Sequence, residues 1–483
     1  MSSPLDGLKP EVLWKFFEVF TTIPRCSGNE AAAARFVLDR ARAKNINAIQ
    51  DATGNVVVRV PGSPGKESSP IVVLQSHLDM VGEKDSDSHH DFGTDPINVV
   101  RAGDWIGAQG TTLGADNGIG AAAALAFLDD AGAVHGPLEL LFTISEEIGL
   151  DGAKALTTDL IKGKILINLD SEEDGALYIG CAGGVDTQVK LKIKRAKASG
   201  EGLKVNVGGL KGGHSGIDIN MGRGNAIQIL AWYLDRLRSE VDFKLVDIKG
   251  GDKHNAIPRE ASALLLVPKG GMEKAAAVRE AATADLNAMF GTTDPGLTLD
   301  LTKTSTKRGA LTRKDRDRFI NLVLSMPHGV LAMSQSIPGL VESSTNLAVV
   351  RLDKASGLLH ESSRSSVMPA LLRIQASIVA LAHGHGAETI DMGGYPGWQP
   401  NLDSMLLRRA RKVFVNTTSK EPAVKAIHAG LECGIIGERL KGMDMISMGP
   451  QIEHPHSPSE RVKIDTVERF YNVLKALVAD LAG

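Results

Sequence analysis

Four short clusters of acidic residues and histidine occur between Gln75 and Ser171, and each one follows or adjoins a run of apolar residues. Imidazole and carboxylate groups without a cluster of thiolates suit a borderline cation such as Zn²⁺, Mn²⁺ or Co²⁺. We therefore interpret the clusters as parts of a metal centre. They are Ser76-His77-Leu78-Asp79, Gly114-Ala115-Asp116-Asn117, Ser145-Glu146-Glu147 and Asn168-Leu169-Asp170.

The first two clusters each admit a structural interpretation as well. His77 and Asp79 would share one face if their strand continued, and a carboxylate beside a metal-bound imidazole holds its second nitrogen. A His-x-Asp pair by itself is more often a structural or surface pair. Asp116 opens a predicted helix, where it could be the N-cap or could instead bridge two metal ions.

Glu146 and Glu147 follow an apolar run, where two adjacent carboxylates are costly to bury unless their charge is compensated. On an exposed loop the pair would carry no information. At a metal centre, one carboxylate can bind the ion while the other takes a proton from water. Asp170 ends a third apolar run. The ordered set therefore predicts a two-metal hydrolase.

Composition narrows the class of protein. The chain has 483 residues, a formal net charge of -3 and three cysteines without a Cys-x-x-Cys motif. The charge gives no reason to expect nucleic acid or an anionic membrane as partner. The cysteines predict reduced thiols in the cytosol. We see neither a signal peptide nor an apolar run of about 18 residues, so we expect a cytoplasmic protein without a membrane span.

The elements that must position the clusters are strands at residues 71–75, 138–144 and 165–169 and a helix at 118–128. A strand at 54–60 and helices at 10–20 and 27–44 precede them, with Ser27 or Asn29 as the candidate N-cap of the second helix. The order of strand, acidic loop and helix indicates α/β architecture, in which functional groups gather at strand ends.

The pattern changes near Gly183. Residues 185–193 alternate apolar and polar, which predicts a half-buried antiparallel strand. Further strands at 261–267 and 347–353 and helices at 225–238, 274–289 and 368–382 predict an inserted α+β domain. The first pattern resumes near Pro400, with helices at 403–415 and 465–481 and a strand at 443–448.

These patterns predict a catalytic domain made of residues 1–185 and 398–483, interrupted by an inserted domain of residues 186–397. The interpretation depends on a histidine in Glu453-His454-Pro455-His456, which must return to a site built before residue 171.

Seven segments, taken as a set, closely resemble metallopeptidase family M20, and within it the aminoacyl-histidine (Xaa-His) dipeptidases. They span nearly the whole chain: SHLDMV, TTLGADNGIG, TISEEIGLDGA, INLDSEEDG, GGHSG, HNAIPREA and GPQIEHPHSP. The resemblance implies a zinc-peptidase-like catalytic domain with a central mixed sheet, and an inserted α+β lid domain.

The resemblance also implies two divalent metal ions per subunit, with Zn²⁺ favoured and Mn²⁺ or Co²⁺ as alternatives. His77 and Asp170 would hold one ion, Glu147 and His456 would hold the other, and Asp116 would bridge both. His454 remains a possible competitor of His456, although His456 aligns better with the family pattern.

Two further catalytic roles follow from the same resemblance. Glu146 would be the general base and then the general acid, and Asp79 would orient His77. The peptide bond between Asp116 and Asn117 is expected to be cis.

Four residues look like substrate-binding positions by resemblance alone: His214, Asn255, Arg364 and Gly434. His214 would help to stabilise the oxyanion, and in this family such a histidine often comes from the partner subunit. We therefore expect a homodimer formed through the inserted domain, although His214 acting within its own subunit stays open.

The sequence thus predicts a metal-dependent dipeptidase that cleaves unblocked dipeptides and favours Xaa-His, including β-alanyl-histidine. One alternative is an M20-type N-acyl amino acid deacylase or carboxypeptidase, because specificity resides in the inserted domain. Another is a catalytically silent binding protein of the same fold, which the presence of every candidate ligand together with Glu146 disfavours.

Overall fold

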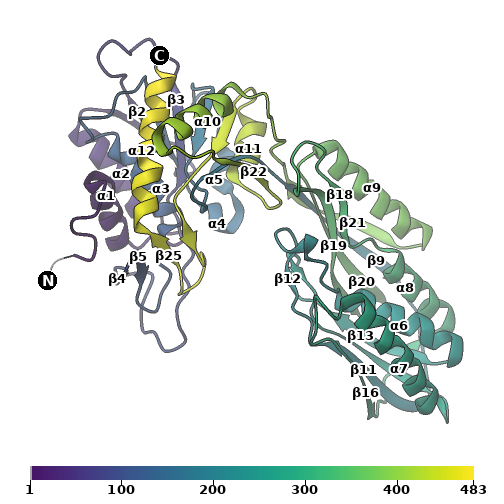
Figure 1. The fold of residues 1–483 in the computed structure, drawn as a ribbon. Coiled ribbons are helices and arrows are strands. Elements are labelled where there is room, and N and C mark those ends of the chain that lie inside the picture. The colour runs from purple at the N-terminus through teal and green to yellow at the C-terminus, as the bar shows by residue number, and fades with distance from the viewer. Residues whose placement is uncertain (1–2) are drawn as a thin grey trace. The chain divides into compact units, whose positions relative to one another are not determined.

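The computed structural model describes residues 3–483, which form two compact units (Figure 1). The first comprises the chain up to Gly180, Pro400–Ala426 and Leu431–Gly483, and the second comprises Cys181–Gln399 and Ile427–Gly430. The sequence analysis placed the two junctions at 185/186 and 397/398, and it did not anticipate that residues 427–430 belong with the second unit. Within residues 3–483, the helices are all too short or too polar to cross a membrane.

A mixed sheet of eight strands forms the centre of the first unit. Four neighbouring strands in its middle, β6, β3, β7 and β23, run parallel to one another, whereas β1, β2 and β8 pair antiparallel. In sheet order the strands are β1 (Asn47–Gln50), β2 (Val56–Val60), β6 (Leu138–Thr143), β3 (Val72–His77), β7 (Ile165–Asn168), β23 (Asp444–Ser447), β8 (Ala176–Cys181) and β22 (Ala423–Ile427).

The central strands are buried along their whole length, as the unbroken apolar runs predict for parallel strands covered on both faces. The helix α3 (Ala115–Ala126) packs on β3 and on α1 (Glu11–Thr22), while α12 (Ile464–Leu481) packs on α10 (Met405–Thr418). The buried side chains of α12 recur at helical spacing: Val467, Phe470, Leu474, Leu477 and Leu481. This arrangement confirms the expected α/β class with a central mixed sheet.

Shorter elements complete the first unit. A sheet of four strands contains β24 (Ile452–Glu453), β25 (Arg461–Lys463), β5 (Trp105–Ala108) and β4 (Val99–Ala102). The remaining helices are α2 (Ala31–Ala43), α4 (Glu146–Gly149), α5 (Asp151–Ala155) and α11 (Glu432–Arg439).

The second unit is built on an antiparallel sheet of nine strands, with four helices along one face (Figure 1). Helices and strands share one apolar core, which includes Leu230, Leu234, Leu265, Phe319 and Ile378. The helices are α6 (Ala226–Glu240), α7 (Gly271–Phe290), α8 (Arg313–Ser325) and α9 (Met368–Gly384). The strands are β16 (Thr298–Thr304), β11 (Glu201–Gly208), β15 (Ala261–Val267), β13 (Lys244–Gly250), β19 (Val341–Leu352), β20 (Ser356–Ser365), β9 (Gly183–Lys192), β21 (Glu388–Tyr395) and β18 (Gly329–Met333), which pairs with β19.

Small pieces lie outside the two large sheets. In the second unit, β12 (Gly213–His214) pairs with β14 (Ala256–Ile257), β10 (Arg195–Ala196) pairs with β17 (Ala310–Leu311), and η1 (Ile219–Met221) is a 3₁₀ turn.

One local expectation was wrong, and one alternative that the sequence left open for Asp116 is excluded. The helix predicted at 27–44 begins at Ala31, and neither Ser27 nor Asn29 caps it, because the Ser27 hydroxyl donates to Asp79 instead. Asp116 does not cap α3 either: the N-cap position is Gly114, and Asp116 lies inside the first turn with non-helical backbone angles. Both polar side chains serve the acidic cluster rather than a helix end.

Candidate metal centre

The ends of three parallel strands bring the acidic clusters to one edge of the central sheet. The strand β3 ends at His77, Glu146 and Glu147 follow β6, and Asp170 follows β7. Because these strands are parallel neighbours, the segments that follow them meet. Asp116 joins them from the first turn of α3, which packs on β3.

The side chains form two groups that share one carboxylate. Nε2 of His77 lies 3.1 Å from Oδ1 of Asp116 and 3.3 Å from Oδ1 of Asp170. Nε2 of His456 lies 3.0 Å from Oδ2 of Asp116 and 3.1 Å from Oε2 of Glu147. Each oxygen of Asp116 therefore faces a different group, which is the arrangement of a carboxylate that bridges two metal ions.

The charge of this cluster fits bound cations. Three carboxylates face two imidazoles, and in each group the candidate ligand atoms lie within 4.8 Å of one another. Among the described residues, Oε1 of Glu147 is buried without a hydrogen-bond partner. Burial and the neighbouring carboxylates Asp116 and Asp170 raise the pKa of Glu172 to about 9. The cluster is thus short of positive charge.

The raised pKa values of the two histidines also indicate a shortage of positive charge in the cluster. Hydrogen bonds with Asp116 and Glu147 raise the pKa of His456 to about 11. Burial opposes a charge on His77, but Asp170, Asp116 and Asp79 outweigh it and raise the pKa of His77 well above its usual value. Nitrogen and oxygen ligands in this mixture suit Zn²⁺ and similar ions, so the residues present fit two divalent metal ions.

Asp79 lies behind His77 and connects it to the glutamate pair. Nδ1 of His77 lies 3.1 Å from the backbone oxygen of Asp79 and 3.4 Å from its Oδ1, which leaves Nε2 to face Asp116 and Asp170. The carboxylate of Asp79 accepts hydrogen bonds from the backbone N–H groups of Glu146 and Glu147 and from the hydroxyl of Ser27. These contacts connect the imidazole of His77 to the loop that carries the glutamate pair.

Glu146 is placed differently from the shared carboxylate. Its carboxylate can approach His77 and Glu147, but it belongs to neither group that contains Asp116. Burial raises the pKa of Glu146 well above its usual value, and the charges of Asp170, Glu432 and Glu147 add to this effect, while His77 opposes it. A carboxyl group with a raised pKa next to a metal site is suited to exchange protons.

Backbone strain is concentrated beside these groups. Ser145, directly before Glu146, has φ 53°, and His456 has φ 58°, both in the left-handed region. Such a conformation costs a non-glycine residue roughly 1–3 kcal/mol and persists only where neighbours fix it. The backbone N–H of Ser145 donates to the buried carboxylate of Glu30 at 3.0 Å, which helps to hold this turn.

The sequence analysis missed three buried charged residues that support the centre. Arg25 donates to the backbone oxygens of Leu78, Asp79 and Gly114. Glu460 accepts from the backbone N–H groups of Leu113, Gly114 and Asp116. Glu432 accepts from Gln75 at 2.6 Å and from Thr143 at 2.7 Å. They lie outside the acidic clusters, and their local sequence gave no signal of a role in the site.

Glycine is needed where the Asp116 loop passes Arg25. Gly114 has φ 73°, and a Cβ there would lie 2.6 Å from Nη2 of Arg25 and 2.7 Å from Sδ of Met80. The peptide bond between Asp116 and Asn117 is cis, as the family resemblance implied. The amide of Asn117 donates to Asp170 and to the backbone oxygen of Leu169.

His454 lies apart from the acidic groups. Its side chain is exposed, its backbone oxygen accepts a hydrogen bond from Ser457, and it belongs to none of the candidate ligand groups found among residues 3–483. The geometry therefore favours His456 over His454 as the C-terminal ligand.

In the second unit, His214 is held as a neutral hydrogen-bond donor. Its Nδ1 accepts from the backbone N–H groups of Gly216 and Ile217 at 3.2 and 3.1 Å, so the proton of a neutral ring lies on Nε2. Burial and then the charge of Arg364 lower its pKa to about 4. A Cβ at Gly216 would lie 2.2 Å from the backbone oxygen of His428, so this turn requires glycine.

The other predicted substrate-binding residues divide between the units. Arg364 is buried on β20 and donates to the hydroxyl of Tyr395 at 2.6 Å. Asn255 is exposed, and its backbone oxygen accepts from Ser215 next to His214. Gly434 lies in α11 of the first unit.

His428 was not anticipated by the sequence analysis. It is buried in the second unit, its Nε2 lies 2.7 Å from the hydroxyl of Ser344, and burial together with the charge of Arg364 lowers its pKa to about 3. A single histidine before Ala429 and Gly430 matches no motif, so the sequence did not indicate a functional or buried position.

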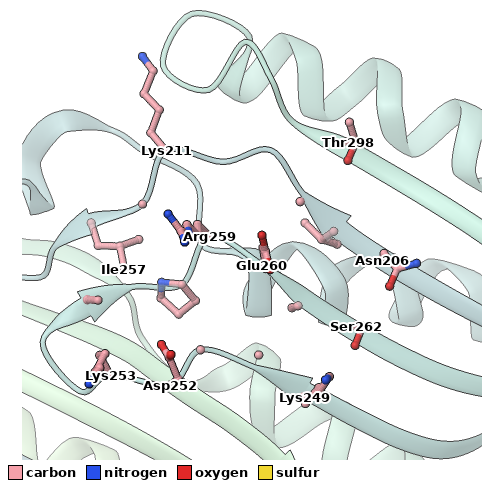
Figure 2. Close-up of a pocket in the computed structure, with 18 of the residues that line it drawn as sticks. Asn206, Lys211, Lys249, Asp252, Lys253, Ile257, Arg259, Glu260, Ser262 and Thr298 are labelled. Carbon is pink, nitrogen blue, oxygen red and sulfur yellow. The ribbon is translucent and has the colours of Figure 1, made fainter. Parts of the chain in front are cut away.

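A groove of about 1040 Å³ lies in the second unit, and its lining differs from that of the acidic metal centre (Figure 2). Basic side chains line much of it, including Lys211, Lys249, Lys253 and Arg259. The described residues that line it include none of the candidate metal ligands and neither His214 nor Arg364. We therefore do not identify this groove with the catalytic site.

Comparison with known proteins decides the family. The model of "Peptidase family M20/M25/M40" matches residues 73–480. The chain belongs to this peptidase family. It is accordingly an enzyme that hydrolyses peptide bonds, and family membership implies divalent metal ions. The expected family and enzyme class are confirmed.

Two relatives match the chain over nearly its full length. It is 40% identical to the "Cytosol non-specific dipeptidase" of Escherichia coli over 481 residues, which covers 99% of each chain. The crystal structure of the aminoacylhistidine dipeptidase from Vibrio alginolyticus matches with a TM-score of 0.92 and 38% identity, covering 99% of this chain and 98% of that one. The aminopeptidase PepT from Bacillus cereus, at 15% identity and a TM-score of 0.56, shares the fold.

Proposed function

We propose that the protein is a two-metal dipeptidase that hydrolyses unblocked dipeptides and favours Xaa-His substrates, including β-alanyl-histidine. The observation that carries the proposal is the placement of the two oxygens of Asp116, one toward His77 and Asp170 and the other toward Glu147 and His456. The printed names of both full-length relatives, each a dipeptidase, support the substrate class.

His77 and Asp170 would hold one divalent ion, Glu147 and His456 the other, and Asp116 both, with Zn²⁺ favoured over Mn²⁺ or Co²⁺. When bound, such ions lower the pKa of water toward neutrality and polarise a carbonyl group. Asp79 would fix the tautomer of His77 by accepting from Nδ1, so that Nε2 presents its lone pair to the ion.

Glu146 would act as general base and then as general acid. Its raised pKa lets the carboxylate take a proton from the attacking water and hold it as a neutral acid. The same proton then passes to the leaving amine as the peptide bond breaks. Because neither group around Asp116 uses Glu146, its carboxylate remains available for this transfer.

His214 would donate its Nε2–H to the oxyanion that develops on the scissile carbonyl. The two backbone N–H groups on its Nδ1 keep the ring in the required tautomer, and the lowered pKa keeps it neutral. Arg364 would pair with the free carboxylate of the dipeptide, which favours short substrates with an unblocked C-terminus. Asn255 and Gly434 would bind the substrate through polar contacts.

We further propose a cytoplasmic homodimer formed through the inserted domain. The name of the Escherichia coli relative supports the location. Whether His214 serves its own subunit or its partner can be tested with mixed dimers of inactive Glu146→Gln and inactive His214→Ala subunits. Recovered activity in verified mixed dimers supports service across the interface, because one site then has both groups. Absence of recovery rules this arrangement out.

A substrate panel tests the proposed activity directly. Metal-reconstituted protein should hydrolyse about twenty unblocked dipeptides to differing extents, with Xaa-His and β-alanyl-histidine among the best. N-acetyl amino acids and longer peptides should be poor substrates. Preferred turnover of N-acetyl amino acids would instead support a deacylase, preferred release of C-terminal residues from longer peptides a carboxypeptidase, and bound metal without any turnover a silent binding protein.

A further inference from the structure

A second cluster of metal-ligating side chains lies within the second unit, separate from the centre around Asp116. It contains Asp186 on β9, His360 on β20, and His254 in the loop between β13 and β14. In the antiparallel register Asp186 pairs with Ser362. His360 precedes Ser362 by two positions on β20, so it is a diagonal neighbour of Asp186 on the same face of the sheet.

The three side chains converge closely. Oδ2 of Asp186 lies 3.0 Å from Nδ1 of His254, and Oδ1 lies 3.5 Å from Nε2 of His360. One ligand atom from each residue lies within 4.8 Å of the other two. Each of the two histidines thus turns a nitrogen toward a different oxygen of the same carboxylate.

An ion pair by itself leaves this cluster incompletely satisfied. Nε2 of His360 is shielded from solvent and, among residues 3–483, makes no hydrogen bond of good geometry. Burial alone would raise the pKa of Asp186, but His360, Ser362 and His254 together lower it, so the carboxylate is ionised at neutral pH. An ionised carboxylate and a buried imidazole nitrogen without a good partner are both suited to bind a cation.

The ligand chemistry indicates which cation would bind. Two imidazole nitrogens and one carboxylate oxygen form a donor set that suits Zn²⁺ and other borderline divalent ions. The side chain of His254 is 57% exposed, whereas those of Asp186 and His360 are 25% and 21% exposed. The cluster is therefore open on the His254 side, where water can complete a tetrahedral shell.

We propose that Asp186, His254 and His360 form a third divalent-cation site, of the Zn²⁺ class, in the inserted domain. This site does not depend on the proposed catalytic function, because it shares no ligand with the groups around Asp116.

A cation at this site would fix the loop of residues 251–255 to the sheet. The next residue after His254 is Asn255, whose backbone oxygen accepts from Ser215, and Ala256 pairs with His214 in the small β12–β14 sheet. The ion would therefore stiffen the backbone that joins the segments carrying His214 and Asn255. It is a structural ion near substrate-binding positions rather than a participant in proton transfer.

Metal counting on the full-length protein tests the proposal. Metal-depleted protein is reloaded with Zn²⁺ and separated from excess ion by gel filtration. Elemental mass spectrometry then gives the Zn²⁺ concentration, which is divided by the protein concentration. The His360→Gln and His254→Gln variants should each hold one Zn²⁺ fewer per chain than the wild type. The matched control His383→Gln, at an exposed histidine in α9 of the same unit, should hold the wild-type number.

The deciding quantity is the difference in Zn²⁺ content per chain between the wild type and each variant. This difference does not depend on how many ions the catalytic centre retains. Because His254 is exposed, its variant tests the site even if His360→Gln disturbs the fold. Equal Zn²⁺ content in wild type and His254→Gln overturns the proposal. Co²⁺ gives a second readout: the wild-type visible spectrum minus that of His254→Gln should show one extra bound Co²⁺, whereas superimposable spectra would contradict the site.

Discussion

Two pairs of histidines, His77 with His456 in the first unit and His214 with His428 in the second, are held in opposite charge environments. In the first unit His77 and His456 lie among carboxylates, which raise the pKa of both rings. In the second unit burial and then Arg364 lower the pKa of His214 to about 4 and that of His428 to about 3. The first pair is therefore suited to face a cation, whereas the second pair is held neutral.

This contrast indicates what each region can stabilise. The acidic cluster favours positive charge, which suits metal ions, whereas a neutral His214 with its proton on Nε2, near a buried arginine, favours negative charge. Amide hydrolysis needs both, since a nucleophile must be generated and an oxyanion must be stabilised. Variants of each region should therefore fail in different ways.

The largest effects, and the clearest difference between activity and metal content, are expected at Glu146 and Glu147. Glu146→Gln removes the proposed base and should lower kcat by about 10²–10⁴-fold while the bound metal remains. Glu147→Gln, its matched neighbour, should lower metal content, because Oε2 of Glu147 faces His456. Steady-state kinetics and metal analysis of both variants check this. Metal loss in Glu146→Gln with retention in Glu147→Gln would reverse the two roles.

A somewhat smaller effect is expected at His214. His214→Ala should lower kcat by roughly 10²–10³-fold, the usual consequence of losing one oxyanion donor, and leave the ions of the Asp116 centre in place. Rates and metal content of the variant are compared with those of His383→Gln, a histidine change at an exposed position of the same unit. Loss of catalytic metal in His214→Ala would contradict the division of labour between the units.

Replacement of the positioning residue Asp79 should have a smaller effect, and it should mainly lower the affinity for metal. Asp79→Asn keeps the shape of the side chain but weakens its hold on His77 and on the backbone of Glu146 and Glu147. Partners of metal ligands typically contribute about 10–100-fold in metal affinity or activity. Competition with a chelator measures the affinity. An unchanged dissociation constant together with unchanged kcat would mean that Asp79 is dispensable.

The smallest effect concerns stability and pH. The folded pKa of His428 is about 3, whereas an unfolded histidine titrates near about 6.5. Between these values the unfolded chain binds the extra proton, so the stability associated with neutral His428 is present above pH 6.5 and is lost as the pH falls.

This loss amounts to at most about 1.4 kcal/mol per pH unit for one proton. Denaturant unfolding of the metal-free protein between pH 4 and 7 should therefore show a shallower decline for His428→Gln than for the wild type. Parallel curves for the two proteins would show that His428 is not held neutral in the fold.

How far the sequence predicts the molecule depends on whether a residue's partners lie close to it in the chain. The strands that end at His77, before Glu146 and before Asp170 were predictable to within one or two residues, because each is a continuous apolar run. The inserted domain was harder. The helix α8 was missed because it begins with the charged run Arg313–Arg318, and its apolar face emerges only from Phe319 onward.

The supporting residues could not be predicted for a different reason. Arg25, Glu432 and Glu460 reach partners 53 to 357 positions away in the chain. Nothing in their local sequence distinguishes them from surface charges. Ser27 was assigned to a helix end on local grounds, but its hydroxyl lies 2.7 Å from Oδ2 of Asp79, a contact that only the folded chain creates.

The central claim is that the carboxylate of Asp116 joins two metal ions. Anomalous diffraction at the zinc edge, from crystals of the Zn²⁺-reconstituted protein, tests it most directly. The account predicts two strong peaks about 3.5 Å apart on either side of the Asp116 carboxylate. One peak should contact His77 and Asp170, and the other should contact Glu147 and His456. A single peak in this region, or a second peak bound by His454 in place of His456, would contradict it.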